Sequence, residues 1–378
     1  MNVLYIAGIN KGGSPQALLN FLAEIKGDSD IKPIVLMGKN DVYENSLNEL
    51  GIENYKLSFC EVNCPRSVAK WKRFLEFCGY PLVILVYYYR LFLSLKEVKK
   101  CVNFNEIDLI HTNDDRVDFG AVLARKYHKK HIWHLREHLT GHFKLYSKRL
   151  FLMKYMNNNA NQFIAISNSV ADNWIENGLN SKKIQVVYDG LTLQDIPKHV
   201  DRNDGINKIV FVGQIYEAKG QKFFLETFSK LPRAIRESFS IDFYGSAEAG
   251  DLQELESIIK ERSIKNVTFH GNISEVAREL YKYDIGVNCS AMEGLGRTTI
   301  EYLAAGLITI AHNTGGSKEI LLNKELLYND EDDLISILTK IYEHSIKIEN
   351  NIQDAEYYKE KYNIALYSQR IMEVYKKL

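Results

Sequence analysis

The stretch IGVNCSAMEGLGRTTIE, residues 285–301, decides how the second half of this chain folds. It begins with an apolar run that is typical of a buried strand, continues through a Gly-x-Gly turn, and ends in residues 297–301, which open a helix. Glu293 and Glu301 stand eight positions apart around this turn. Because glycine lets a backbone approach a ligand and a helix start attracts anions, the stretch predicts a ligand site.

The same alternation of apolar runs and helical stretches continues along the chain and indicates an α/β protein with two helix-covered parallel sheets. A polar stretch at residues 193–207 separates two sets of runs. We therefore predict domains at residues 1–190 and 208–350, a linker at 191–207 and a C-terminal helix at 351–378. The predicted strands are residues 3–7, 34–37, 108–111, 132–135, 163–166 and 185–187, then KIVFVG, SIDFYG, NVTFHG, IGVNCS and ITIAH.

Composition argues against several classes of function. The 378 residues carry 48 Lys plus Arg against 48 Asp plus Glu, so no overall charge favours nucleic acid. The five cysteines form no CxxC pair, which indicates free thiols rather than a metal site. The opening MNVLYIAGINKGGS has no basic leader, and its apolar run enters a glycine turn as a first strand does. We expect a cytoplasmic protein that does not bind nucleic acid.

Glycines at the ends of the apolar runs mark further candidate loops, because ligands of open α/β sheets lie at the carboxyl ends of strands. In INKGGSPQALLNFL, Gly12 and Gly13 precede a helix, although such a turn is as often purely structural. In FVGQIYEAKGQKFFLETF, a strand ends at Gly213, and Lys219 stands just before a helix. That lysine either meets a phosphate or is a solvated loop residue. The run SIDFYG ends in the same way at Gly245.

Taken in order, these loops resemble those of the family 4 glycosyltransferases, the retaining group with the GT-B fold. The motifs are the early KGGS, FVGQIYEAKG and the segment from VTFHG to GGSKEIL, residues 267–321. The most specific part is the Glu293–Glu301 pair, preceded by Ser290 and followed by an Ala-Gly pair at 305–306. The resemblance implies two Rossmann-like domains that face each other across a cleft, the first binding the acceptor and the second a nucleotide sugar. It is dense in the second half and thin in the first, and we expect the C-terminal helix to cross back to the first domain.

The resemblance also implies roles for particular residues. Glu301 would accept hydrogen bonds from the ribose hydroxyls of the donor, and Glu293 would contact the sugar ring. Lys219 would neutralise charge on the leaving phosphate. In the structural alternative, Glu301 faces solvent on a helix that Glu293 caps. The other donor contacts are expected at Gly12, Gly13, Gly213, Gln214, Gly245, Leu295, Gly296 and Arg297.

One departure from the family pattern lies in the donor loops. Gln214 stands where the family commonly has an arginine, and it cannot supply a positive charge. A charged hydrogen bond to phosphate is worth roughly 1.5–3 kcal/mol. We therefore expect Lys219 or Arg297 to carry more of the phosphate charge in this chain.

A second departure lies in the first domain. The strand that usually ends in a His-acid pair reads HIWHLREH, which leaves His134, Arg136, Glu137 and His138 as candidates for the cleft. Alternation along the strand puts His134 and Arg136 on one face and His138 just beyond the strand end. We predict a catalytic role for His138 with Glu293 and Lys219, and acceptor-side roles for His134 and Arg136. The family's linker motif appears as Tyr188-Asp189-Gly190.

The function implied is that of a hexosyltransferase of cell-surface polysaccharide synthesis. It would move a sugar, with retention, from a UDP- or GDP-linked donor to a glycan or lipid-linked glycan. The donor's own phosphate would take the acceptor proton, and no metal is expected because lysine and helix amides can supply the positive charge. The alternatives are a non-catalytic sugar-nucleotide-binding protein, suggested by Gln214, and a GT-B epimerase. The glutamate pair and Lys219 favour transfer.

One apolar stretch, PLVILVYYYRLFLSL at residues 81–95, stands outside this scheme. Fifteen residues are too few to span a bilayer as a helix. Residues 66–100 contain eight basic and two acidic residues, a net charge of +6. Aromatic and basic residues together favour a peripheral contact with the anionic inner face of the cell membrane. The alternative is a buried helix with solvated flanks.

Overall fold

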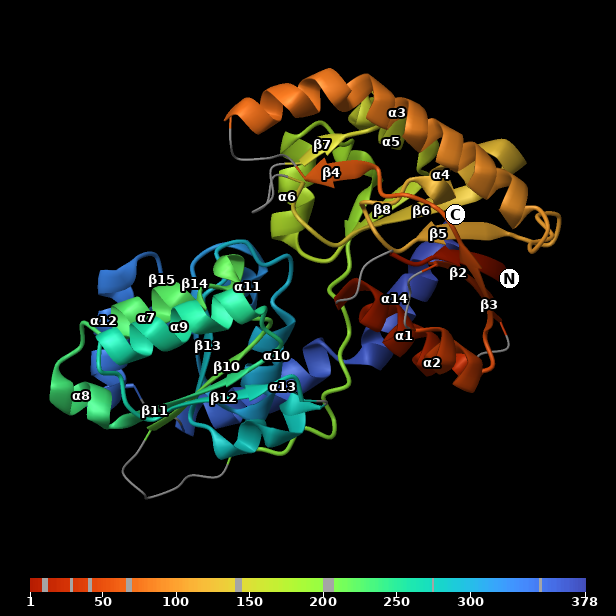
Figure 1. Ribbon diagram of the computed structural model, residues 1–378. Helices are drawn as coiled ribbons and strands as arrows, with labels where there is room; N and C mark the ends of the chain where they lie inside the picture. Colours follow the sequence, from red (N-terminus) through yellow and green to blue (C-terminus); the bar gives the residue numbers. More distant parts are fainter. Residues whose placement is uncertain are drawn as a thin grey trace. The chain divides into compact units, whose positions relative to one another are not determined.

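The computed structural model describes residues 1–8, 13–27, 30–39, 43–65, 70–139, 145–199, 207–273, 275–346 and 349–378. The chain forms two compact units (Figure 1). The first unit is Met1–Gly190 with Ile364–Leu378, and the second is Leu191–Asn363. Each unit is built on its own parallel sheet, which agrees with the predicted fold class.

The first unit contains a seven-stranded sheet with the order β3-β2-β1-β5-β6-β8-β9, in which every neighbouring pair is parallel. The strand order reverses between β1 and β5. The sheet strands are β1 (Asn2–Ile6), β2 (Lys32–Gly38), β3 (Glu53–Leu57), β5 (Leu109–Thr112), β6 (Lys130–Leu135), β8 (Gln162–Ala165) and β9 (Ile184–Val186).

Helices cover both faces of this sheet, because buried parallel strands present apolar side chains on both sides. Val3 and Tyr5 pack with the helices α1 and α14, whereas Leu4 and Ile6 pack with α3 and α4. The helices of the unit are α1 (Gly13–Glu24), η1 (Ile25–Gly27), α2 (Glu44–Glu49), α3 (Lys70–Val98), α4 (Phe119–Tyr127), α5 (Leu152–Asn159), α6 (Asn168–Glu176), η2 (Ser181–Lys183) and α14 (Ile364–Lys376).

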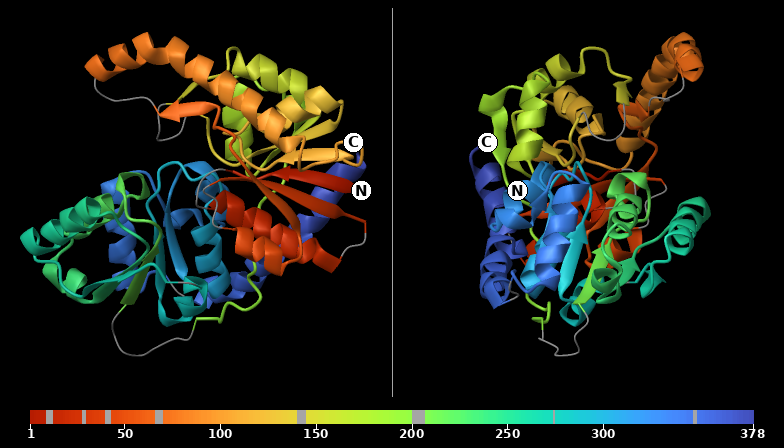
Figure 2. Two further views of the ribbon diagram at one scale, coloured as in Figure 1. Left: turned by 45° about the vertical axis from the view of Figure 1, so that its right-hand side comes forward. Right: turned by 90° about the vertical axis from the view of Figure 1, so that its left-hand side faces the viewer.

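Helix α3 is longer than the apolar stretch at residues 81–95, and it is not the buried helix that the sequence offered as the alternative. It spans 29 residues and runs along the outside of the first unit (Figures 1 and 2). Leu82, Leu85 and Tyr89 are 65%, 67% and 63% exposed, so the alternative of a buried helix is wrong. Among the described residues, Cys78–Val98 is the one helical segment whose length and composition would suffice to cross a membrane. A short antiparallel pair, β4 (Asn63–Pro65) with β7 (Leu145–Ser147), was not predicted.

The second unit contains a six-stranded sheet with the order β12-β11-β10-β13-β14-β15, again parallel throughout. The strand order reverses between β10 and β13. The strands are β10 (Asn207–Val212), β11 (Phe239–Tyr244), β12 (Val267–Gly271), β13 (Ile285–Asn288), β14 (Ile308–His312) and β15 (Leu327–Tyr328).

Helices of the second unit follow its strands in the predicted alternation. Tyr302 of α10 fixes one of them on the sheet: its ring fills the space above Gly286, and its hydroxyl accepts a hydrogen bond from Val212 N–H at 2.7 Å. The helices are η3 (Glu217–Lys219), α7 (Gln221–Phe228), α8 (Arg233–Glu237), α9 (Ala249–Glu261), η4 (Val276–Lys282), α10 (Arg297–Ala305), α11 (Gly315–Ile320), η5 (Lys324–Leu326), α12 (Glu331–Tyr342) and α13 (Glu349–Lys361).

The C-terminal segment forms two helices where the sequence predicted one. α13 belongs to the second unit and α14 to the first, where Tyr375 Oη lies 2.6 Å from His111 Nδ1. The helix is interrupted at Tyr362 and Asn363, because Leu191 N–H donates to Tyr362 C=O at 2.8 Å and Leu191 forms a bridge with Asn363. The chain passes from one unit to the other next to Leu191 and again next to Asn363, and these two segments are therefore bonded to each other.

The predicted linker begins where the first unit ends, at Gly190, but its first part is packed. Leu191, Leu193 and Ile196 are buried, and His199 N–H donates to Ala305 C=O at 2.8 Å. These apolar residues explain why residues 191–199 belong to the second unit. Residues 200–206 of the predicted linker lie outside the described residues, and its last residue, Asn207, is the first residue of β10.

Candidate functional site

The turn between Glu293 and Glu301 lies where the second sheet changes direction. It follows β13, whose neighbour β10 ends at Val212, just before Gly213. Both strands direct their carboxyl ends to the same edge of the sheet, because they are parallel. Ligand crevices of open α/β sheets form at such a switch point.

Glycines allow the turn to pack closely against the next helix. Gly296 has φ +89° and precedes α10, and Gly315 has φ +60° at the start of α11. A Cβ on Gly315 would lie 2.5 Å from Glu293 C=O, and one on Gly316 would lie 2.4 Å from Leu295 C=O. The Gly316 N–H donates to Glu293 C=O at 2.8 Å. The first two residues of α11 therefore fix the backbone of the turn.

Lys219 and Glu293 form an ion pair across this site. The distance from Lys219 Nζ to Glu293 Oε1 is 2.5 Å, and the side chains are 28% and 18% exposed. Gly220, with φ +79°, makes the contact possible, because a Cβ there would lie 2.7 Å from the backbone oxygen of Cys289. The structure therefore brings together two of the three predicted catalytic residues.

Glu301 and Arg297 lie one turn apart on α10. Burial raises the pKa of Glu301 above its usual value, and the positive charge of Arg297 partly offsets this effect. Leu295 is buried at 3% exposure, so the turn presents its backbone rather than this side chain. The first backbone N–H groups of α10 point toward the turn, as at any helix start. Carboxylate, guanidinium and amides are thus assembled within one turn of helix.

Gly213, Gln214 and Gly245 follow the neighbouring strands β10 and β11. A Cβ on Gly245 would lie 2.0 Å from Gly213 C=O, so only glycine fits at this position. Gly213 N–H donates to Tyr244 C=O at 2.8 Å. Gln214 is exposed, and its backbone C=O accepts a hydrogen bond from Gln221 Nε2 at 3.0 Å. These three predicted donor residues lie together at the carboxyl ends of the strands.

The remaining predicted donor residues belong to the first unit. Gly12 lies outside the described residues, and Gly13 is the first residue of α1. Ser14 Oγ donates to Asn113 C=O at 3.0 Å, and Asn113 Nδ2 donates to Ser14 C=O at 3.0 Å. The start of α1 is thereby tied to the residue that follows β5. Helix α1 follows β1, and β1 and β5 are the neighbouring strands at the switch point of the first sheet.

Arg136 is buried in a polar cluster just beyond β6. Its Nη1 donates to both carboxylate oxygens of Asp189 at 2.8 Å, and its Nη2 donates to Asn113 Oδ1 at 2.7 Å. The Arg136 and Asp189 side chains are each 4% exposed. The cluster holds the chain in place one residue before Gly190, where the first unit ends.

His134 lies in the core of the first unit. It has no exposed surface, and its Nδ1 lies 3.3 Å from His111 Nε2, with the two rings stacked. Burial, followed by the charge of Arg136, holds the pKa of His134 well below its usual value, so the imidazole is neutral. Any effect of this residue on an acceptor would therefore be indirect.

His138, the third predicted catalytic residue, follows β6 and is 8% exposed. Its Nε2 lies 2.8 Å from Ser169 Oγ in the first turn of α6. The adjacent Leu139 N–H donates to Asn173 Oδ1 at 2.9 Å, which fixes the loop on the same helix. A catalytic role for His138 stays a prediction.

A buried network of side-chain hydrogen bonds beneath the turn was not predicted. Asn288 Nδ2 donates to Thr299 Oγ1 at 2.9 Å, and Thr299 Oγ1 lies 3.3 Å from Ser317 Oγ. Asn288 Oδ1 also accepts the Ser290 N–H at 3.1 Å. This network joins β13, α10 and α11 and so orients the turn. Its one signal in the sequence is Asn288, an amide inside an otherwise apolar run.

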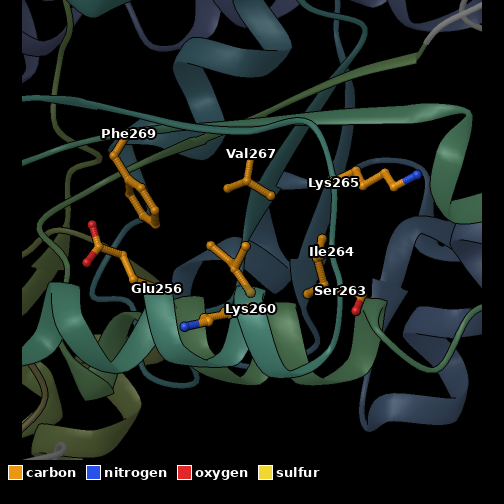
Figure 3. A pocket seen from close by; sticks show the side chains of 8 residues that line it. Glu256, Lys260, Ser263, Ile264, Lys265, Val267 and Phe269 are labelled. Carbon is orange, nitrogen blue, oxygen red and sulfur yellow. The ribbon is translucent and has the colours of Figure 1, made fainter.

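A hollow of about 420 Å³ lies between α9 and β12, outside this site. Figure 3 shows the ring of Phe269 directed toward α9. Ser263, Ile264 and Lys265 also line the hollow, and they lead into the amino end of β12. Ligands of parallel sheets bind at the opposite, carboxyl edge. We therefore do not assign the hollow to the candidate site.

Comparison with solved structures identifies the fold. Anabaena HepE, solved with UDP and glucose, has a TM-score of 0.73 to this chain at 17% identity, with 100% of both chains covered. Sucrose-phosphate synthase from Thermosynechococcus elongatus has a TM-score of 0.71 at 14% identity, covering 100% of this chain and 98% of that chain. The fold is GT-B, as predicted.

Sequence relatives identify the family. The model for Glycosyl transferases group 1 matches residues 194–370, and that for Glycosyltransferase Family 4 matches residues 49–195. An uncharacterized glycosyltransferase of Methanocaldococcus jannaschii is 22% identical over 306 residues, which is 72% of this chain and 76% of the relative. A GDP-Man:Man(3)GlcNAc(2)-PP-Dol alpha-1,2-mannosyltransferase of Mus musculus is 27% identical over 190 residues, 44% of this chain and 39% of the relative. The chain belongs to the family 4 glycosyltransferases.

Proposed function

We propose that this glycosyltransferase is a retaining hexosyltransferase of cell-surface polysaccharide synthesis. Its donor would be a UDP- or GDP-linked sugar, and its acceptor a glycan or lipid-linked glycan. The names of the similar proteins support both parts: HepE was solved with UDP and glucose, and the mouse relative is named for GDP-mannose and a dolichol-linked glycan. We further propose that it acts in the cytoplasm, at the inner face of the cell membrane.

The observation that carries the proposal is the Lys219–Glu293 pair at the carboxyl ends of β10 and β13, with Glu301 on the adjoining helix. Glu301 would accept hydrogen bonds from the donor's ribose hydroxyls, and Glu293 would contact the sugar. The amides at the start of α10 would meet the diphosphate. Lys219 would exchange its contact with Glu293 for the leaving phosphate as negative charge builds there.

The proposed reaction is a substitution on one face of the sugar. An acceptor hydroxyl oxygen bonds to the anomeric carbon while the bond from that carbon to the diphosphate oxygen breaks. The hydroxyl proton passes to the departing phosphate, and the nucleoside diphosphate leaves. The protein mainly positions the two substrates and stabilises charge. We propose that no metal is needed, because Lys219 and the amides of α10 can supply the positive charge.

A thermal-shift screen against nucleoside diphosphates tests the donor. A ligand at 100 times its dissociation constant adds about 2.7 kcal/mol to the free energy of unfolding. We expect UDP or GDP to raise the melting temperature and ADP and CDP not to do so. Transfer from the matching nucleotide sugar should then continue in EDTA. A non-catalytic binder would show the shift without product, an epimerase would convert the sugar without an acceptor, and no shift with any nucleotide would refute the proposal.

The raised pKa of Glu301 predicts how nucleotide affinity depends on pH. The ionised carboxylate accepts two hydroxyl donors, so affinity is complete above this pKa and falls as the pH drops through it. The loss should begin at a higher pH than for an ordinary glutamate, whose pKa is about 4.3. The contribution of Glu301 to stability has the opposite sign and is lost as the pH rises through the same pKa.

Nucleotide dissociation constants measured by calorimetry, from neutral pH downward, check this prediction. The matched control is Glu301→Gln, which keeps the shape of the side chain but does not titrate. The terminal phosphate of the nucleotide titrates equally with both proteins, so the difference between their curves isolates Glu301. Parallel curves would show that the carboxylate does not contact the ribose.

A further inference from the structure

We propose that the outer face of α3 is a membrane-docking surface that lies flat on an anionic lipid bilayer. The proposal rests on the proposed function, because this surface would hold the enzyme at the membrane that carries a lipid-linked acceptor. The docking surface consists of seven large apolar side chains, each at least 40% exposed: Leu82, Leu85, Val86, Tyr88, Tyr89, Phe92 and Leu93.

Polar contacts hold the opposite face of α3 to the first unit. Tyr80, Tyr87 and Ser94 are spaced by seven residues, about two helical turns, so they lie on one side of the helix. The Tyr80 hydroxyl donates to Ser147 C=O, the Tyr87 hydroxyl to Asp118 Oδ2 at 2.5 Å, and the Ser94 hydroxyl to Ser58 C=O at 2.6 Å. Arg149 also binds Asp118 and lies against the Tyr87 ring.

These anchors determine which side of α3 remains uncovered. At about 100° per residue, the members of the docking surface fall within an arc of about 160°, facing away from Tyr80, Tyr87 and Ser94. They extend over about 17 Å of helix. Large apolar patches on an otherwise folded surface mark interaction sites. Because the inner face is bound to protein, α3 cannot enter a bilayer as a spanning helix without losing those hydrogen bonds.

Charge identifies the occupant of the docking surface. Lys96, Lys99 and Lys100 are exposed at the C-terminal end of α3, and the Lys96 ammonium lies 4.5 Å from the centre of the Phe92 ring. Glu97 is the single acidic residue between positions 78 and 100, and it pairs with Lys39 at 3.7 Å. An apolar stripe beside a basic edge is the pattern of a helix that lies in an anionic membrane interface.

The same charge disfavours a second copy of this chain as the occupant. Two copies meeting through α3 would bring together two segments of net charge +3, residues 78–100 of each. Like charges at an interface oppose association. An anionic leaflet, in contrast, supplies both the apolar layer for Leu85 and Phe92 and the negative charge for the lysines.

Flotation of the full chain with lipid vesicles tests the proposal. We expect binding to phosphatidylcholine vesicles that contain phosphatidylglycerol, at least 10-fold tighter than to phosphatidylcholine alone, and weaker binding in 1 M salt. Leu85→Ser with Phe92→Ser should lower vesicle affinity on the order of 100-fold, because two large apolar side chains are lost from the contact. Replacing Lys96, Lys99 and Lys100 with glutamine should lower it to a similar degree.

The second unit offers a matched control, Leu322→Ser with Tyr342→Ser. These side chains are 48% and 37% exposed and do not belong to the docking surface, so the variant loses two exposed apolar side chains and should bind vesicles as the unaltered chain does. All variants should keep the nucleotide-induced melting shift, which separates this proposal from the proposed function. The proposal is overturned if anionic vesicles do not bind, if the α3 variants bind unchanged, or if sedimentation shows a dimer that the α3 variants dissociate.

Discussion

Replacing Lys219 with alanine should lower turnover on the order of 100-fold or more while the protein stays folded. A factor of 100 corresponds to about 2.7 kcal/mol of transition-state stabilisation, which a lysine aimed at a developing phosphate charge can supply. Gln214 adds no positive charge beside it, so a greater share falls on Lys219. Folding should survive because the Lys219–Glu293 pair is partly exposed, and such pairs contribute at most about 1 kcal/mol.

The matched control for this variant is Lys222→Ala. Lys222 lies in the first turn of α7 and pairs with Glu254 at 2.5 Å, with side chains 46% and 51% exposed. Its removal takes away the same charge only three residues further along and should leave turnover within about twofold, since distant exposed charges are screened. Steady-state rates at saturating donor and acceptor compare the two variants. Near-normal turnover in Lys219→Ala would remove Lys219 from the proposed mechanism.

The sheets were predictable because buried parallel strands are continuous apolar runs. Residues 3–7 and 132–135 correspond to β1 and β6, for example, with ends that differ by one or two positions. β3 was missed because its sequence ENYKL is mostly polar and forms no apolar run, as suits a strand at a sheet edge. The exposure of α3 was one of two interpretations of its sequence, and composition could not decide between them, since an apolar run has the same composition whether a protein core or a membrane covers it.

For the candidate site, the sequence allowed a set of residues to be proposed but not the contacts between them. The positions of Glu293 and Glu301 followed from the glycine turn and the resemblance to the family. The pairing of Lys219 with Glu293 joins residues 74 positions apart, and it depends on the close approach of Gly220 to Cys289. No local spacing encodes such a contact, because the sheet topology sets the distance between loops.

Asp189→Ala should destabilise the first unit by about 3–5 kcal/mol, because it leaves the buried Arg136 guanidinium without its carboxylate. At 2–4 °C per kcal/mol, the melting transition of that unit should fall by roughly 10 °C. Arg136 would keep its bonds to Asn113, which is why we do not expect complete unfolding. Thermal unfolding with hydrogen exchange, which assigns the loss to the first unit, measures the effect.

Glu137→Ala serves as the control for Asp189→Ala. It breaks the neighbouring Arg116–Glu137 pair, whose side chains are 25% and 55% exposed, and should cost less than about 1 kcal/mol. The double variant Arg136→Leu, Asp189→Leu should be less destabilised than Asp189→Ala, because no unpaired charge stays buried. If the double variant were the least stable of the three, the attraction between Arg136 and Asp189 would itself stabilise the first unit. The loss of stability in Asp189→Ala would then not come from the unpaired buried charge alone.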